Sequence, residues 1–439
     1  MASKVIQDPV HGAIGIDGVF LDILGRPEMQ RLRQVRQLGL GCLVFPGANH
    51  TRFEHCLGTY HLAGQMAEAI GLDRDDSRAV RMAGLLHDVC HPPFSHALEA
   101  AMEDATGMGH MDMARALVFG RVPCFREEDS DLHGGMVTMA ELMEADGISP
   151  DEVCGIISSP ESTGVEVLDR FWNKHEYFPS KDYSHQIIHG PVDADQMDYL
   201  MRDAHHTGVS HGRIDCDRLL KTMSVVNDRI ALSRGGITAA EGLMVSRSLM
   251  YTTVYFHETV RIAQRMITKS VEASGVDVSD IHLLGDHDLE SRVIASGGRP
   301  SLEVRRVRAR DLDKKALMVY SEGMDDDLAE TLIRYSGRRG AGRLEGEIAD
   351  IAGIDVMDVV AEVTSKENLQ GRINIGKTDV SIADENGRVR SLARYSPIAR
   401  ALQSRDPYGW AVFVACPKDR VEAVSKASRK VLGLRFSLL

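Results

Sequence analysis

The stretch Arg81-Met-Ala-Gly-Leu-Leu-His87-Asp88-Val-Cys-His91-Pro-Pro-Phe-Ser-His96 sets three imidazoles and a carboxylate at the end of one apolar helical run. Neighbouring side chains on a regular helix point about 100° apart, so His87 and Asp88 both reach one cation only where the helix ends or is distorted. The proline pair after His91 supplies such a break. The pattern predicts a metal site here, whereas the isolated pair His287-Asp288 is expected to open a surface helix.

A second segment offers side chains for the same site. Phe45-Pro-Gly-Ala-Asn-His-Thr-Arg52-Phe-Glu-His55 places Arg52 one turn before His55 at the start of an amphipathic helix. This spacing brings a phosphate-binding guanidinium near a metal-binding imidazole. The two segments together therefore predict a phosphate group beside a metal ion.

A third segment supplies carboxylates. Asp195 and Tyr199 lie four residues apart, so a helix presents them on one face, together with Arg202 or Asp203. Two imidazoles with two carboxylates suit Fe, Mn, Co, Ni or Zn with positions open for water and phosphate oxygen, and they lack the thiolates of a structural zinc site. The candidate ligands are His55, His87, Asp88 and Asp195.

Composition limits the classes of protein that fit. The chain has 439 residues and a net charge of −13, which disfavours a general nucleic-acid binder. Its seven cysteines never form a Cys-x-x-Cys pair, which favours reduced thiols and a cytoplasmic location. No apolar run approaches the ~18 residues that span a bilayer, and the N-terminus does not resemble a signal peptide. We expect neither a membrane nor nucleic acid as a partner.

Helical periodicity dominates the first part of the chain, whereas β-type runs such as Trp410–Ala415 alternate with helices in the last part. We predict a mainly α fold with a helical domain over residues 1–270, an extended N-terminal arm or hairpin, and a smaller α+β region over residues 271–439. The closing segment Lys418–Leu432 is predicted to be helical.

Two Gly-rich stretches are weak candidates for phosphate binding. Gly371-Arg-Ile-Asn-Ile-Gly376-Lys377-Thr378 fits the phosphate-loop pattern, but such a loop needs a helix after it, and here a hairpin around Asn386-Gly387 is predicted. We therefore reject a P-loop. The stretch Ser336–Gly346 is interpreted as a surface loop, although its arginines suit a polyanion.

The order His, His-Asp, Asp resembles that of the HD-domain metal-dependent phosphohydrolases, and more narrowly their deoxynucleoside-triphosphate triphosphohydrolase branch. The similarity extends from Lys4 to about Lys269. The motifs that carry it are Asp8-Pro-Val-His-Gly, Gln30-Arg-Leu-Arg-Gln-Val-Arg-Gln-Leu-Gly, the segment ending at His55, Leu86-His-Asp-Val-Cys-His-Pro-Pro-Phe-Ser-His and Asp195-Gln-Met-Asp-Tyr-Leu-Met-Arg-Asp. The resemblance implies a helical HD-domain core.

Carried over residue by residue, the resemblance assigns roles within the site. It makes His55, His87, Asp88 and Asp195 the metal ligands. It makes His91, His96 and His133 the acid–base and phosphate-contacting imidazoles, with Glu99 orienting one of them. It implies substrate contacts from Arg52 to phosphate, from Gln37 and Tyr199 to the sugar, from Asp203 to its 3′ side, and from Arg247 with Tyr255 to the polyphosphate and sugar edge.

The sequence departs from the family pattern at three positions. Gln196 stands where a lysine on the phosphates is expected, Gly134 where an acid follows the His133 position, and Tyr251 where a histidine is usual.

The resemblance also suggests a nucleotide effector site on the N-terminal arm. Lys4 and Arg33 fit that role, whereas Gly25 stands where an acid would read a guanine.

The activity implied by the resemblance is hydrolysis of deoxynucleoside triphosphates to deoxynucleoside and inorganic triphosphate by metal-activated water. His96 or His133 is the candidate proton donor. The expected cofactor is a divalent transition metal (Fe, Mn, Zn, Ni or Co), with Mg²⁺ as a candidate ion on the substrate phosphates. The expected partners are a nucleotide substrate and further copies of the chain, as a dimer or tetramer.

Two alternatives stay open. The first is an HD phosphohydrolase acting on a nucleoside monophosphate, a cyclic dinucleotide or an alarmone, and the second is a nucleotide-sensing protein without activity. The motifs themselves do not decide which phosphorus is attacked.

Overall fold

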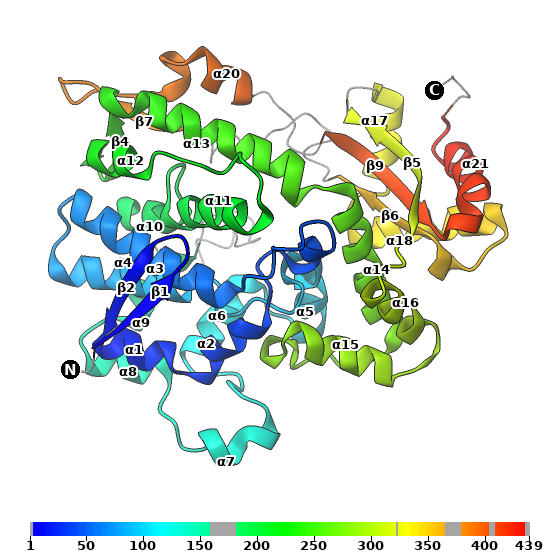
Figure 1. The fold of residues 1–439 in the computed structure, drawn as a ribbon, viewed down its shortest axis with the longest axis horizontal. Coiled ribbons are helices and arrows are strands. Elements are labelled where there is room, and N and C mark those ends of the chain that lie inside the picture. Colours follow the sequence, from blue (N-terminus) through cyan, green and yellow to red (C-terminus); the bar gives the residue numbers. More distant parts are fainter. Residues whose placement is uncertain (1–2, 159–180, 322–323, 365–378, 404–408, 435–439) are drawn as a thin grey trace, which may run out of the picture.

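The computed structural model describes residues 3–158, 181–321, 324–364, 379–403 and 409–434. Over these residues the fold is mainly helical, as predicted, with short strands gathered in small sheets (Figure 1). The rejected phosphate-loop stretch Gly371–Thr378 lies outside the described residues. No helix in the described part of the chain has the length and apolar character needed to cross a membrane.

The first part of the chain forms a bundle of helices around one large apolar core. Its helices are α1 (Gly18–Leu24), α2 (Pro27–Arg31), α3 (Arg52–Ala69), α4 (Arg74–Leu86), α5 (Glu99–Thr106), α6 (His110–Val118), α7 (Ser130–His133), α8 (Met139–Ala145), α9 (Pro150–Ile157), α10 (Asp182–His189), α11 (Ala194–Thr207), α12 (Cys216–Thr222), α13 (Ile237–Met250) and α14 (Glu258–Ser274). The helices α3, α4 and α11 pack together at its centre.

Local sequence signals define where the central helices begin and end. Thr51 and Glu54 form a capping box at the start of α3, and Asp73 accepts the backbone N–H groups of Asp75 and Asp76 at the start of α4. The helix α4 ends at Leu86, so the residues that follow it leave the helical path. The break predicted near the proline pair is therefore present.

The N-terminal arm is a hairpin, as the sequence predicts. Strands β1 (Ser3–Asp8) and β2 (Gly12–Asp17) pair antiparallel, and the carboxylate of Asp8 accepts the N–H groups of Val10 and His11 at 2.9 and 2.8 Å. Gly12 has a φ of +75°, a conformation that favours glycine. This tight turn fixes the direction in which the ring of His11 points.

The last part of the chain combines helices and strands. Its helices are α15 (Asp286–Ala295), α16 (Gly298–Arg308), α17 (Asp326–Ile333), α18 (Gly337–Ala352), α20 (Pro397–Gln403) and α21 (Val421–Val431). Its strands are β5 (Lys314–Tyr320), β6 (Val360–Val363), β7 (Ser381–Ala383), β8 (Val389–Ser391) and β9 (Trp410–Cys416). The predicted closing helix is thus present as α21.

Strand β9 lies at the centre of a sheet with the order β5-β9-β6. Phe413 faces the large core, whereas Val412 and Val414 belong to a second core beneath α18 and α21. Burial on both faces explains why this strand is a continuous apolar run rather than an alternating one.

The stretch Ser336–Gly346 is a helix rather than the predicted surface loop, because it forms the first part of α18. Ala341, Leu344 and Ile348 recur at helical spacing and are buried, and Leu344 and Ile348 belong to the second core. Burial of this apolar stripe outweighs the unfavourable helix propensity of its glycines. The prediction gave the glycines too much weight.

The end of the chain returns to the helical bundle. The hairpin β7–β8, which the sequence predicts around Asn386-Gly387, pairs in parallel through β7 with β4 (Arg229–Ser233), and β4 pairs with β3 (Met223–Val226). Figure 1 shows β7 and α20 beside β4 and α13. The helix α14 also continues across residue 270. The division of the chain at residue 270 stays a prediction.

Glu345 on α18 is a buried anchor between the two parts of the chain. Arg265 donates to it at 3.0 and 3.1 Å, and Lys269 Nζ lies 3.1 Å from its Oε2. We expect Glu345→Ala to lower the free energy of unfolding by about 3–5 kcal/mol, because the buried Lys269 loses its carboxylate partner and Arg265 is left with Glu272 at 3.4 Å. Urea unfolding checks this. Asp350→Ala, an exposed site on the same helix, should change stability by less than about 0.5 kcal/mol. Equal losses in both variants would contradict the account.

Candidate metal centre

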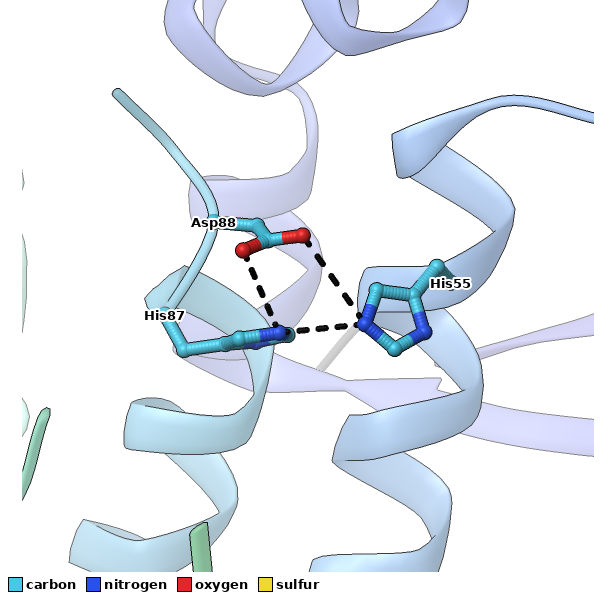
Figure 2. A group of neighbouring side chains, drawn as sticks. All are labelled: His55, His87 and Asp88. Atoms are coloured by element: carbon cyan, nitrogen blue, oxygen red, sulfur yellow. Dashed lines mark hydrogen bonds and ion pairs between the residues drawn. The ribbon is translucent and has the colours of Figure 1, made fainter. Parts of the chain in front are cut away.

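The four predicted metal ligands converge on one point. His55 comes from the first turn of α3, His87 and Asp88 follow the end of α4, and Asp195 lies in the first turn of α11. Figure 2 shows the side chains of His55, His87 and Asp88 turned toward one another. The two Nε2 atoms are 3.2 Å apart, and Asp195 Oδ1 lies 3.1 Å from His55 Nε2 and 3.8 Å from His87 Nε2.

The outer nitrogens of both rings have fixed partners. His87 Nδ1 lies 2.9 Å from the carbonyl oxygen of Gly84, and His55 Nδ1 lies 2.7 Å from Asp198 Oδ2. Each partner is an acceptor, so each Nδ1 carries a proton and each Nε2 is the ring atom placed to bind a metal ion. Metal-binding histidines are held in this way, and the donor set therefore fits a divalent transition metal.

The electrostatics of the cluster favour a cation. Burial lowers the pKa of His55, but Asp195 and Asp198 outweigh burial and raise that pKa to about 10. Burial raises the pKa of Asp88, but Arg52, His87 and His91 outweigh it and hold the pKa well below its usual range. The carboxylates are thus ionised at neutral pH, and a proton or a metal ion at the centre is stabilised by them.

Asp198 supports His55 and is itself held on several sides. Arg202 donates to both of its oxygens at 2.9 Å, and His11 Nε2 lies 2.6 Å from Oδ1. Arg202 also donates to Asp8 in the hairpin turn at 2.8 Å. A Cβ at Gly58 would lie 1.8 Å from Asp198 Oδ1, so only glycine permits this approach of α11 to α3.

A cavity of about 490 Å³ adjoins the cluster. Arg52 lies in its wall, pairs through Nη1 with Asp88, and donates from Nε to Ser95 Oγ at 2.8 Å. The predicted substrate residues that line the cavity are Gln37, Arg52, Tyr199, Asp203 and Tyr255. The lining does not include the remaining one, Arg247, whose guanidinium carbon lies 5.5 Å from the ring centre of Tyr251.

Local backbone geometry shapes the cavity wall. Residues Tyr251–Tyr255 form a π-helical turn between α13 and α14, and this turn places both tyrosines against the cavity. Tyr255 Oη donates to Asp203 Oδ2 at 2.8 Å, and His50 Nε2 lies 2.7 Å from Asp203 Oδ1. The buried Asp203 carboxylate is therefore held in one orientation beside the cavity.

The predicted acid–base residues are only partly brought together. His91 Nε2 lies 3.0 Å from Asp88 Oδ1, and His91 Nδ1 lies 3.2 Å from Glu99 Oε1, so this histidine and Glu99 do meet at the site. His133 lies on α7, with its ring 5.4 Å from that of Phe125, on a segment that extends away from the metal cluster in Figure 1. The side chain of His96 lies outside what the structure describes, so its role stays a prediction.

The structure adds His110, the first residue of α6, which sequence reasoning did not single out. Its ring lies 4.3 Å from that of His91, and it can join Asp88 and His91 in holding a cation. Burial and the neighbouring His91 lower the pKa of His110 to about 3, so its ring is neutral at neutral pH. A lone histidine after Gly-Met-Gly carries no metal-ligand spacing, and only the fold brings it to the site.

Two protein-family models match this chain. A family model described as the HD domain matches residues 52–122, and one described as the HD associated region matches residues 214–437. An uncharacterized protein of Methanocaldococcus jannaschii is 31% identical over 435 residues, covering 97% of this chain and 82% of that protein. The chain belongs to the HD-domain phosphohydrolase family.

Two further relatives match shorter stretches of the chain. The deoxynucleoside triphosphate triphosphohydrolase SAMHD1 of Homo sapiens is 30% identical over 294 residues, covering 60% of this chain and 44% of that protein. An uncharacterized protein of Bacillus subtilis is 34% identical over 272 residues, covering 61% of this chain and 54% of that protein. The chain thus spans about half the length of these two relatives.

Solved structures share the whole fold. A phosphohydrolase from Bacteroides thetaiotaomicron has a TM-score of 0.67 at 24% identity, covering 95% of this chain and 100% of that one. A hypothetical protein from Aquifex aeolicus has a TM-score of 0.68 at 25% identity, covering 97% of this chain and 100% of that one. The fold shared with these structures therefore includes the last part of the chain as well as the helical bundle.

The two His-Asp pairs of the chain offer a matched test of metal binding. We expect His87→Ala to reduce bound Mn²⁺ to below about a tenth of the wild-type level, because a buried ligand nitrogen is lost. His287→Ala should bind as wild type, since the His287 side chain, in the first turn of α15, is 74% exposed. Mass spectrometry of the metal content after Mn²⁺ loading and gel filtration checks both variants. Equal metal content in the two would contradict the assignment.

Proposed function

We propose that this protein hydrolyses deoxynucleoside triphosphates to deoxynucleoside and inorganic triphosphate, with a divalent transition metal held by His55, His87, Asp88 and Asp195. The observation that carries the proposal is the position of Arg52. Its guanidinium contacts Asp88 on one side and the cavity on the other. A volume of about 490 Å³ falls within the range of small-ligand pockets.

The metal cluster and Arg52 together suit attack on a phosphate group. A divalent metal, when bound, supplies a water of lowered pKa and polarises a phosphate oxygen. Arg52 offers forked donors to the anionic oxygens of the same phosphate. Its hydrogen bond to Ser95 and its ion pair with Asp88 hold the guanidinium in place before the substrate arrives.

The far wall of the cavity suits a nucleoside. The rings of Tyr199 and Tyr251 lie 5.8 and 5.1 Å from that of Tyr255, which gives an aromatic surface against which a sugar or base can pack. Beside it the fixed carboxylate of Asp203 can accept a hydrogen bond from a sugar hydroxyl. This combination of aromatic and polar groups supports a nucleotide rather than inorganic polyphosphate as the substrate.

His91 is the best-placed proton donor among the described histidines. Its two ring nitrogens face the carboxylates of Asp88 and Glu99, which hold the ring in one orientation. A protonated His91 can pass its proton to the leaving 5′ oxygen.

A second candidate is hydrolysis of a nucleotide with fewer phosphates, such as a nucleoside monophosphate. The arginines that line the cavity both have acidic partners, Arg52 with Asp88 and Arg261 with Glu362. Gln196, where the family resemblance leads us to expect a lysine, is buried and uncharged. A cavity whose arginines are already paired with acids suits a substrate with a shorter, less negatively charged phosphate chain.

Product analysis separates these candidates. Purified protein is incubated with each dNTP, NTP and dNMP plus Mn²⁺, Fe²⁺ or Mg²⁺, and the products are followed by phosphorus NMR and chromatography. We expect inorganic triphosphate and deoxynucleoside, with turnover lowered about a thousandfold or more in Asp88→Ala, because a metal contributes several kcal/mol of transition-state stabilisation. Asp288→Ala, at the other His-Asp pair, should retain wild-type turnover.

The other outcomes of this assay are equally clear. Release of orthophosphate from a triphosphate would place the attack on an outer phosphorus and contradict the proposed reaction. Hydrolysis of monophosphates alone would favour the second candidate. Metal binding without turnover of any of these nucleotides would favour the nucleotide-sensing alternative.

A further inference from the structure

We propose that Asp286, on α15, is a positioning residue for the active site: its carboxylate fixes the two backbone segments that form one side of the nucleotide cavity and so orients Arg52. This inference rests on the proposed function for its effect on turnover. The structural part of it, that Asp286 orders these two segments, is testable without any substrate.

Asp286 connects segments that are distant in the chain. Its Oδ1 accepts the backbone N–H of Phe94 at 2.9 Å, and its Oδ2 accepts the backbone N–H of Arg36 at 3.2 Å, partners that are 192 and 250 residues earlier. The side chain is 1% exposed. Two hydrogen bonds from a buried carboxylate to loop backbone are strong constraints on both loops, because each N–H would otherwise be buried without an acceptor.

The two hydrogen bonds are not needed to begin the helix on which Asp286 lies. That role belongs to Asp288, whose Oδ2 accepts the N–H of Gly285 at 2.9 Å. The start of α15 is also pressed against the loop, since a Cβ at Gly285 would lie 2.5 Å from the Cβ of Gln34. The Asp286 carboxylate therefore stabilises the two loops rather than the start of its own helix.

The Phe94 segment needs such a constraint. Phe94 and Ser95 have φ values of 56° and 55°, a left-handed backbone conformation that residues other than glycine rarely adopt. This turn presents Ser95 Oγ to Arg52 Nε at 2.8 Å, and Ser95 Oγ in turn donates to the carbonyl oxygen of Arg36 at 3.3 Å. The Asp286 carboxylate thus acts on the guanidinium of Arg52, the proposed phosphate ligand, through the Phe94–Ser95 turn.

The Arg36 segment leads to the same cavity. The residue after it, Gln37, lines the cavity, and its N–H donates to the carbonyl oxygen of His50 at 3.0 Å, next to the start of α3. Asp286 itself is not part of the cavity lining. Both of its oxygens therefore act on the cavity through neighbours, which makes Asp286 a positioning residue rather than a catalytic one.

The test is Asp286→Asn in the full chain, with Asp288→Asn as the matched control two residues along the same helix. The amide of asparagine has the same shape but only one oxygen, so one of the two loop N–H groups loses its acceptor. Hydrogen–deuterium exchange followed by mass spectrometry should show faster exchange, by about tenfold or more, in peptides covering residues 34–39 and 92–97 of Asp286→Asn only.

Turnover should change together with exchange. With the dNTP that the wild type hydrolyses fastest, Asp286→Asn should lose about 10–100-fold in kcat/KM, chiefly in kcat, while its Mn²⁺ content stays at the wild-type level. Asp288→Asn should match the wild type in exchange, kcat/KM and metal content. If Asp286→Asn does not fold, Ser95→Ala replaces it. We then expect a loss of about tenfold in kcat with the metal retained, because Arg52 loses its support.

The outcomes are separable. Unchanged exchange at both peptides in folded Asp286→Asn, or wild-type kcat in Ser95→Ala, would overturn the inference. If the wild type hydrolyses no dNTP, the proposed function fails. The exchange measurement then still decides whether Asp286 orders the cavity wall.

Discussion

The buried carboxylate of Asp198 is the interaction on which the rest of the site depends. It receives hydrogen bonds or ion pairs from α3 through His55, from its own helix through Arg202, and from the N-terminal hairpin through His11. Burying these charges is favourable only while each has its partner, and loss of one partner of a buried pair typically costs about 3–5 kcal/mol. The requirement for this pairing sets how closely α3, α11 and the hairpin approach one another.

The metal cluster follows from that packing. With His55 fixed by Asp198, its Nε2 faces the end of α4, where His87 and Asp88 leave the helix. The same approach brings the first turn of α11, and with it Asp195, to the cluster. The excess of carboxylates raises the pKa of His55 to about 10, so this position favours positive charge, and a metal ion bound there would take the place of a proton.

Much of this arrangement was predictable from the sequence, because the signals are local. The end of α4, the hairpins and the strand Trp410–Cys416 follow from prolines, turns and apolar runs. The approach of the four ligands required the family resemblance, since spacing alone does not show that α3, α4 and α11 are neighbours. His110 and Asp198 gave no separate signal: the first is a lone histidine, and the second is recognisable only once α3 lies against α11. The helix at Ser336–Gly346 was missed because its stability comes from burial in the second core rather than from propensity.

The last part of the chain takes part in the site as well as in the fold. It contributes β7 to a sheet with β4, Glu345 to the buried ion pairs of α14, and Asp286 to hydrogen bonds with the two loops beside the cavity.

Arg52 joins the metal cluster to the proposed nucleotide cavity, and crystallography tests this junction most directly. Crystals are grown with Mn²⁺ and a deoxynucleoside triphosphate analogue that cannot be cleaved, and data are collected at the manganese absorption edge. We predict an anomalous peak among His55, His87, Asp88 and Asp195, a phosphate on Arg52, and the sugar beside Asp203 and Tyr255. A manganese peak elsewhere, or a nucleotide bound outside this cavity, would contradict it.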